Sequence, residues 1–174
     1  METIKQQVAD LLDQEPTLLP AEMATRLNVS EYQVVSSLPK AMVAILDGGA
    51  ALAIFERLVG FGPVMTIMHS FGSIFEVKAP FPKGKVAHGY YNLMGKEGEL
   101  NGHLSLDRIK NIALVSKPFR GRESHYIGFF CESGNNIFKV YLGRDKKRNL
   151  IPSQVELFKE WQLKVHTKQF EMID

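Results

Sequence analysis

The chain is poor in the features that define secreted and membrane proteins. It has one cysteine, Cys131, so no intrachain disulfide can form. No apolar run approaches the roughly 20 residues that a membrane-spanning helix needs, and the N-terminus carries Glu2, Lys5 and Asp10 where a secretory signal would be apolar. These absences predict a cytosolic (cytoplasmic) protein without a membrane partner. The length of 174 residues suits one well-cored domain with a small appendage.

Familiar catalytic motifs are also missing. The sequence contains no Gly-rich phosphate loop, no HExxH, no CxxC and no GxSxG. Cys131 follows Phe129 and Phe130, which is typical of a packing residue rather than a nucleophile. We therefore expect a protein that is not an enzyme.

Charge is distributed unevenly along the chain. Residues 1–56 contain eight acids and three bases, for a net charge of −5, whereas residues 78–148 contain fourteen bases and six acids, for a net charge of +8. Residues 18–39 read as two short helices around a tight turn, with Ser30 and Gln33 forming a capping box, which is the outline of a DNA-binding helix-turn-helix. The second helix, "EYQVVSSL", has no basic residue. Since DNA affinity comes largely from Lys and Arg on phosphates, we expect a helical cap and no nucleic-acid partner, with a DNA-binding regulator as an alternative.

The order of patterns predicts an α+β fold. Helical spacing covers residues 3–12 and 50–58, and strand-like segments separated by short turns follow from Val64. Short connections favour an antiparallel sheet, and residues 153–165 close the chain as an amphipathic helix. We predict an N-terminal helical region over 1–58, packed on one large antiparallel sheet that forms, with the C-terminal helix, residues 59–174 of one compact domain.

Histidines and tyrosines in the predicted strands are the candidate functional residues. Strand alternation puts His88, Tyr90 and Asn92 on one face and Tyr91 on the other. His103 points away from a leucine-rich face, and His69 shares the side of Met65 and Ile67. Imidazoles, phenols, apolar surface and basic residues together suit haem, although each residue alone also fits an ordinary packing or surface role.

Five segments in order resemble the ChuX/HutX (HuvX) family of bacterial haem-utilisation proteins. They are "PVMTIMH", "HGYYNLMGK", "GHLSLDRI", "IALVSKPFRGRESHYIGFF" and "FKVYLGRDKKRNL". The resemblance implies a HemS/ChuS/ChuX-like fold and a haem-binding protein that stores haem or passes it to a haem-degrading partner. It also implies a homodimer whose two sheets are similar to the halves of the larger HemS/ChuS-type proteins. A haem-degrading enzyme that uses an external electron donor is a further alternative.

The resemblance also assigns residues. His69 and His103 match histidines associated with haem in the family, and Tyr90 and Tyr91 lie in its "HGYxN" motif. The candidate axial ligands of the iron are therefore Tyr90, His69 and His103. His88 is predicted to support the site from behind the ligands or to be structural, and the candidate contacts of the haem propionates are Lys117, Arg120 and Arg122.

Overall fold

The structure is a computed structural model and describes residues 2–171. Its helices are α1 (Ile4–Gln14), α2 (Pro20–Leu27), α3 (Glu31–Val35), α4 (Ala51–Leu58) and α5 (Pro152–His166), with short 3-10 turns η1 (Gly48–Ala50) and η2 (Leu106–Arg108). Its strands are β1 (Val43–Asp47), β2 (Pro63–Ser70), β3 (Ser73–Pro80), β4 (Gly84–Ala87), β5 (Tyr90–Leu93), β6 (Gly102–Ser105), β7 (Asn111–Ser116), β8 (His125–Phe130) and β9 (Asn136–Leu142).

Local signals at helix ends act as the sequence predicts. Ser30 Oγ accepts a hydrogen bond from the Gln33 N–H at 3.1 Å, and the Gln33 side chain accepts one from the Ser30 N–H at 2.9 Å. This reciprocal box satisfies two backbone donors that the start of α3 would leave unpaired. Asn28 ends α2 in the left-handed conformation, with φ of 54°. The predicted helix-turn-helix outline is therefore confirmed as local structure.

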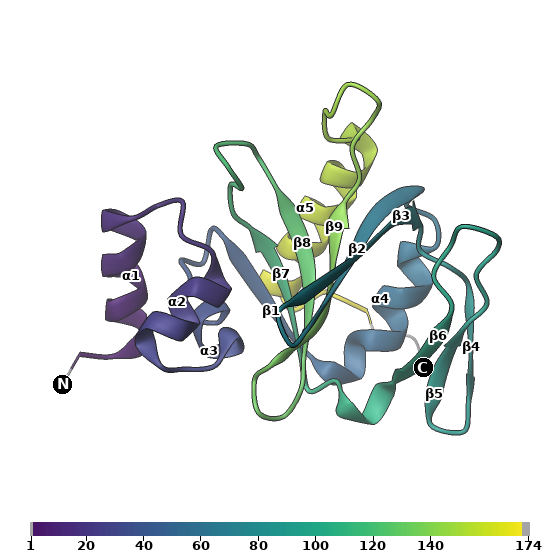
Figure 1. The fold of residues 1–174 in the computed structure, drawn as a ribbon, viewed down its shortest axis with the longest axis horizontal. Coiled ribbons are helices and arrows are strands. Elements are labelled where there is room, and N and C mark those ends of the chain that lie inside the picture. Colours follow the sequence, from purple (N-terminus) through teal and green to yellow (C-terminus); the bar gives the residue numbers. More distant parts are fainter. Residues whose placement is uncertain (1, 172–174) are drawn as a thin grey trace.

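The strands form two antiparallel sheets. The main sheet has six strands in the order β1-β7-β8-β9-β2-β3, and the small sheet has three in the order β4-β5-β6 (Figure 1). The α+β class is confirmed, but the sequence predicted one sheet. It also missed β1, which lies in the supposed helical region and pairs with β7 from Val43↔Val115 to Asp47↔Asn111. A five-residue strand between a proline and two glycines is too short for its period to be recognised.

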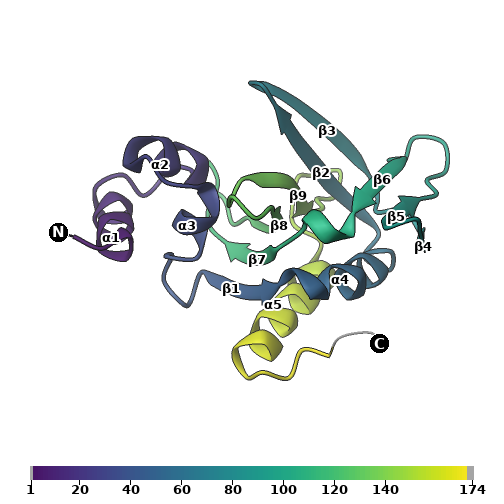
Figure 2. The ribbon, with the colours of Figure 1, turned by 90° about the horizontal axis from the view of Figure 1, so that it is seen from below.

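Helices cover both faces of the main sheet. The N-terminal helices pack on one face through Val34 and Val35 of α3, which are fully buried against β7 and β8 residues such as Val115 and Phe130. Helices α4 and α5 cover the opposite face (Figure 2). Within residues 2–171, no helix combines the length and apolar character needed to cross a bilayer.

Phe55 of α4 joins the two sheets. Its fully buried ring lies 5.1 Å from the Phe129 ring and 6.1 Å from the Phe138 ring of the main sheet, measured between centroids. The same ring stacks on Tyr91 of the small sheet at 5.2 Å and on Phe81 at 5.7 Å. The small sheet is therefore fixed by side-chain packing on α4, since the two sheets share no β-ladder among the described strands.

Candidate functional site

The small sheet has one face in the core and one at the surface. Tyr91 and Leu93 of β5 are buried, and Tyr91 is only 2% exposed. Burial raises the pKa of the Tyr91 phenol. Tyr90 and Asn92 alternate to the other face, where Asn92 is the cross-strand partner of His103. The predicted alternation is correct, but Tyr91 is a core residue and does not reach the candidate surface.

Asn92 fixes the ring of His103. The Asn92 amide nitrogen donates to the carbonyls of Lys85, Ala87 and Tyr90 at 3.0, 3.2 and 3.3 Å, so its oxygen must point the other way. That oxygen lies 2.6 Å from His103 Nδ1. Because an amide oxygen only accepts, Nδ1 of a neutral His103 carries the proton and Nε2 keeps its lone pair. Histidines that bind metals are held in this way.

Tyr90 lies beside His103 on the same surface. Their ring centroids are 6.0 Å apart in an edge-to-face arrangement, and Tyr90 is 43% exposed. The pair presents a phenol and an imidazole, both of which bind haem iron in proteins. Within one chain, these are the two predicted axial ligands that the structure brings together.

His88 lies in a turn and not in the strand that the sequence suggested. With Gly89 it forms the two-residue connection between β4 and β5, and its φ of 57° is left-handed. This position is two residues before Tyr90 in the chain, but strand alternation does not orient the imidazole.

His69 points to a different side of the molecule. It alternates with Met68 along β2, and Met68 packs against the core that contains α4 and α5. His69 therefore belongs, as predicted, with Met65 and Ile67, on the opposite face of the main sheet. One chain does not bring His69 to the Tyr90–His103 pair.

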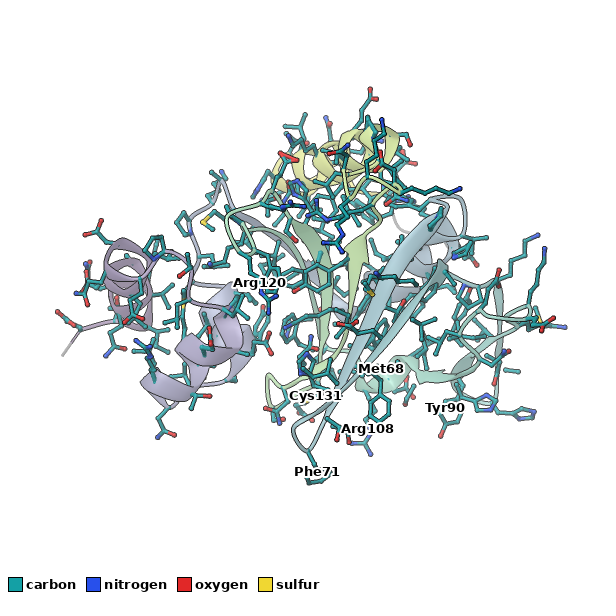
Figure 3. All side chains as sticks on the ribbon, turned by 45° about the horizontal axis from the view of Figure 1, so that its top comes forward. Met68, Phe71, Tyr90, Arg108, Arg120 and Cys131 are labelled. Carbon is teal, nitrogen blue, oxygen red and sulfur yellow. The ribbon has the colours of Figure 1, made fainter. Side chains whose placement is uncertain are left out.

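Exposed apolar side chains are concentrated in two hairpins, β2–β3 and β4–β5. Of the large hydrophobic residues that are exposed within residues 2–171, six come from two hairpins between residues 71 and 94, namely Phe71, Ile74, Phe75, Val86, Tyr90 and Met94. Figure 3 shows Met68, Arg108 and Tyr90 on the same side of the molecule, with Phe71 at the tip of the β2–β3 hairpin. Ile74 is the cross-strand partner of His69 and Val86 is that of Tyr91, so these two side chains face away from Tyr90 and His103. The remaining exposed apolar area is of the kind that marks a binding surface. Arg108, which directly follows the "GHLSLD" segment, adds a cation that our sequence analysis missed.

The three predicted propionate contacts lie elsewhere in the chain. Lys117 is only 4% exposed, its Nζ donates to the Pro16 carbonyl at 3.0 Å, and burial lowers its pKa. Arg120 and Arg122 lie at the tip of the β7–β8 hairpin. Figure 3 shows Arg120 near the N-terminal helices and away from Tyr90. One chain therefore does not bring these three residues to the candidate surface.

The helix-turn-helix packs against the chain's own sheet. Helix α3 has five residues and uses Val34 and Val35 for the core. Glu31, at its start, forms an ion pair with Lys139 of β9. These contacts support the interpretation of this segment as a helical cap.

The fold and the paired phenol and imidazole are those of an α+β haem-binding protein, and comparisons with known proteins agree with this class. The chain belongs to the ChuX/HutX haem utilisation family, whose model matches residues 44–161. It is 65% identical, over 162 residues, to the intracellular heme transport protein HutX of Vibrio cholerae serotype O1, covering 93% of this chain and 84% of that protein. A crystal structure of ChuX superposes with a TM-score of 0.85 at 28% identity, over 95% of this chain and 99% of ChuX.

A longer protein shares the fold. The apo structure of PhuS, a heme-binding protein from Pseudomonas aeruginosa, matches 99% of this chain with a TM-score of 0.76 at 17% identity. The match covers only 49% of PhuS. PhuS is thus about twice as long as the fold that it shares with this protein.

Proposed function

We propose that this protein binds haem reversibly as cargo, on the surface formed by Tyr90 and His103, and carries it inside the cell to a haem-degrading recipient. The observation that supports this most directly is the Asn92–His103 hydrogen bond beside Tyr90, because it leaves an imidazole lone pair next to a phenol. The name of the Vibrio relative, an intracellular heme transport protein, agrees with this assignment.

The donors fit haem better than a bare ion. The porphyrin already supplies four nitrogen ligands, so the protein needs only one or two axial donors and an apolar surface for the ring. A free phenol has a pKa of about 10, and the charge of ferric iron favours its ionised form. Phenolate binds ferric iron better than ferrous iron. Tyrosine ligation would therefore hold oxidised haem and loosen when the iron is reduced, which suits a carrier.

A hemin titration of single variants tests the site. We expect Tyr90→Phe or His103→Ala to change the Soret spectrum and to weaken binding at least tenfold, since loss of an axial ligand removes a metal bond. His69→Ala and the surface control His166→Ala should keep the wild-type spectrum. Wild-type affinity in both Tyr90→Phe and His103→Ala would contradict this site.

Turnover separates a carrier from a haem-degrading enzyme. Haem-loaded protein is mixed with ascorbate in air, and the Soret band is followed over time. A carrier keeps its band until an acceptor such as apomyoglobin is added. Loss of the band with formation of a bile pigment, before any acceptor is added, would instead establish the enzyme.

We also propose a homodimer that forms through the β2–β3 hairpin. Phe71 at its tip is fully exposed, at 108%, and its φ is 48°, in a turn where Asn is preferred. An exposed aromatic ring in an unfavourable backbone conformation indicates a contact outside the chain. The double length of PhuS relative to the shared fold is compatible with a second copy in this role.

Phe71→Asn tests the dimer without harming the turn. Light scattering on a size-exclusion column should give twice the chain mass for wild type and for the control Leu163→Asn, whose residue is exposed on α5. Phe71→Asn should give the monomer mass. A Phe71→Asn variant that is still dimeric would contradict this interface.

A further inference from the structure

Two arginines of this chain occupy backbone conformations that arginine disfavours. Arg120 has φ of 50° and Arg148 has φ of 65°. Side chains with a Cβ rarely adopt this left-handed region, where Gly, Asn and Asp are usual. When such a conformation is kept, it often marks a functional position.

Each arginine lies in a tight turn that would accept another residue more easily. Arg120 and Gly121 form a two-residue turn closed by the hydrogen bonds Phe119 N–H to Arg122 O, 2.8 Å, and Arg122 N–H to Phe119 O, 3.0 Å. Asn-Gly is the preferred pair for such a turn. Arg148 follows a turn in which its N–H donates to Asp145 O at 2.9 Å, and glycine is preferred at that position.

The two turns belong to neighbouring loops at one end of the main sheet. The Arg144 guanidinium donates to the Glu123 carbonyl at 2.6 Å, which ties the loop after β9 to the β7–β8 hairpin. Figure 1 shows both loops projecting from the same end of the sheet, on the side opposite the β2–β3 tip. Six exposed cations gather there and form what we call the basic edge: Arg120, Arg122, Arg144, Lys146, Lys147 and Arg148.

The edge also contains two acids, Glu123 and Asp145, and neither pairs with its cations. Glu123 lies 3.3 Å from His125 Nε2, and Asp145 accepts the N–H groups of Lys147 and Asn149 at 2.8 and 3.0 Å. Within residues 2–171, none of the six cations forms an ion pair with a carboxylate. The guanidinium of Arg120 instead lies over the half-exposed ring of Phe119 at 5.2 Å. The edge therefore carries a net charge of +4, from six bases and two acids, beside an aromatic ring.

We propose that the basic edge is a docking surface for an acidic segment of a partner protein. The surface is separate from Tyr90 and His103, so the partner can bind without displacing haem. Charge complementarity also favours a short acidic segment, which covers only the basic edge, over a long polyanion. Residues 1–39, which contain the N-terminal helices, carry six acids and two bases, for a net charge of −4. They border the edge where Lys117 contacts Pro16, and they would repel a DNA duplex or an anionic membrane that reached beyond the edge.

The test uses a fluorescein-labelled peptide of about twelve Glu and Asp residues and measures anisotropy at 50 and 200 mM NaCl. We expect salt-sensitive binding to the full chain, weakened about tenfold by Arg120→Asn combined with Arg148→Asn. The control Lys168→Asn is compared with each single variant, Arg120→Asn and Arg148→Asn, because it too removes one cation from a left-handed position, with φ of 56°, but just after the end of α5. This control should stay within twofold of wild type.

The arginine variants separate binding from folding. Because asparagine suits both turns, the double variant should melt no lower than wild type and should bind hemin normally, so a loss of peptide binding reports the edge alone. Equal peptide affinity in the wild type and the double variant would overturn the proposal. Tighter binding of a 20-base-pair duplex or of phosphatidylserine vesicles through the same arginines would also overturn it.

Discussion

The ammonium of Lys139 lies 2.5 Å from the Glu31 carboxylate, where the first turn of α3 meets the main sheet. Both side chains are largely buried, with 9% and 13% of their surfaces exposed. Burial raises the pKa of the neighbouring Tyr141 phenol to about 12, and the charge of the Glu31 carboxylate is the second cause. The ion pair thus connects the helical cap to the sheet inside the protein.

Removing one charge of this pair should lower the free energy of unfolding more than removing both charges. Glu31→Gln leaves a buried ammonium without its counter-charge, and we expect a loss of about 3 kcal/mol in the free energy of unfolding. The double variant Glu31→Gln/Lys139→Met should recover more than half of that loss. Urea denaturation of Glu31→Gln, Lys139→Met and the double variant measures the coupling energy between the two charges. Additive losses would show that the two charges do not interact.

Asn92→Ala should weaken haem binding although Asn92 is not an axial ligand. The substitution frees the His103 ring, and loss of a residue that orients a metal-binding histidine typically costs 10- to 100-fold in affinity. Hemin titration measures the change. Asn135→Ala, in the β8–β9 turn, is the matched control and should keep wild-type affinity. Wild-type affinity in Asn92→Ala would mean that His103 does not need the hydrogen bond to Asn92 to bind haem.

Phe55→Ala should destabilise the protein by about 3–5 kcal/mol, because it removes a fully buried ring that four other aromatic rings contact. Leu157→Ala, at a 38% exposed site on α5, should cost less than about 1 kcal/mol. Thermal and urea unfolding compare the two variants. Similar losses would mean that Phe55 is not the centre of the core.

Acid should destabilise the fold through His125. Burial lowers its pKa, and the nearby Glu123 carboxylate opposes this only in part. With the folded-state pKa below the unfolded value of about 6.5, the unfolded chain binds the proton first as the pH falls. The stabilising contribution is therefore complete above about pH 6.5 and is lost below it, by at most about 1.4 kcal/mol per pH unit.

His125→Gln checks this dependence, because glutamine can still hydrogen-bond Ser116, whose Oγ lies 2.7 Å from His125 Nδ1. The variant should lose less stability than wild type between pH 7.5 and 5.5. The exposed His166→Gln should behave like wild type. A steeper acid dependence in His125→Gln than in wild type would contradict the direction of the shift.

Local signals made much of this structure predictable. The Ser30–Gln33 capping box, the alternation that separates Tyr90 from Tyr91, and the closing helix all depend on residues close in sequence. Strand β1 and the division into two sheets depend on pairings across the chain, such as Val43 with Val115, which no local pattern contains.

The candidate site shows the same limit. Period-two alternation placed Tyr90, Asn92 and His103 correctly, but the Asn92–His103 hydrogen bond requires the strand register, which sequence alone does not give. Lys117, Arg120 and Arg122 could not be located without knowing at which end of the sheet their hairpin lies. The left-handed conformations of Arg120 and Arg148 were equally invisible, since their sequence positions resemble ordinary loops.

For the proposed haem surface, the aromatic stack around Phe55 has a consequence for how the porphyrin would be held. The phenol and imidazole stand on one sheet, while Met68 and the β2–β3 tip belong to the other, and the thickness of those interleaved rings sets the gap between them. Because the interior is close-packed, a buried substitution such as Phe to Leu would change that gap. At the proposed site, the affinity for haem would thereby depend on buried residues that do not touch it.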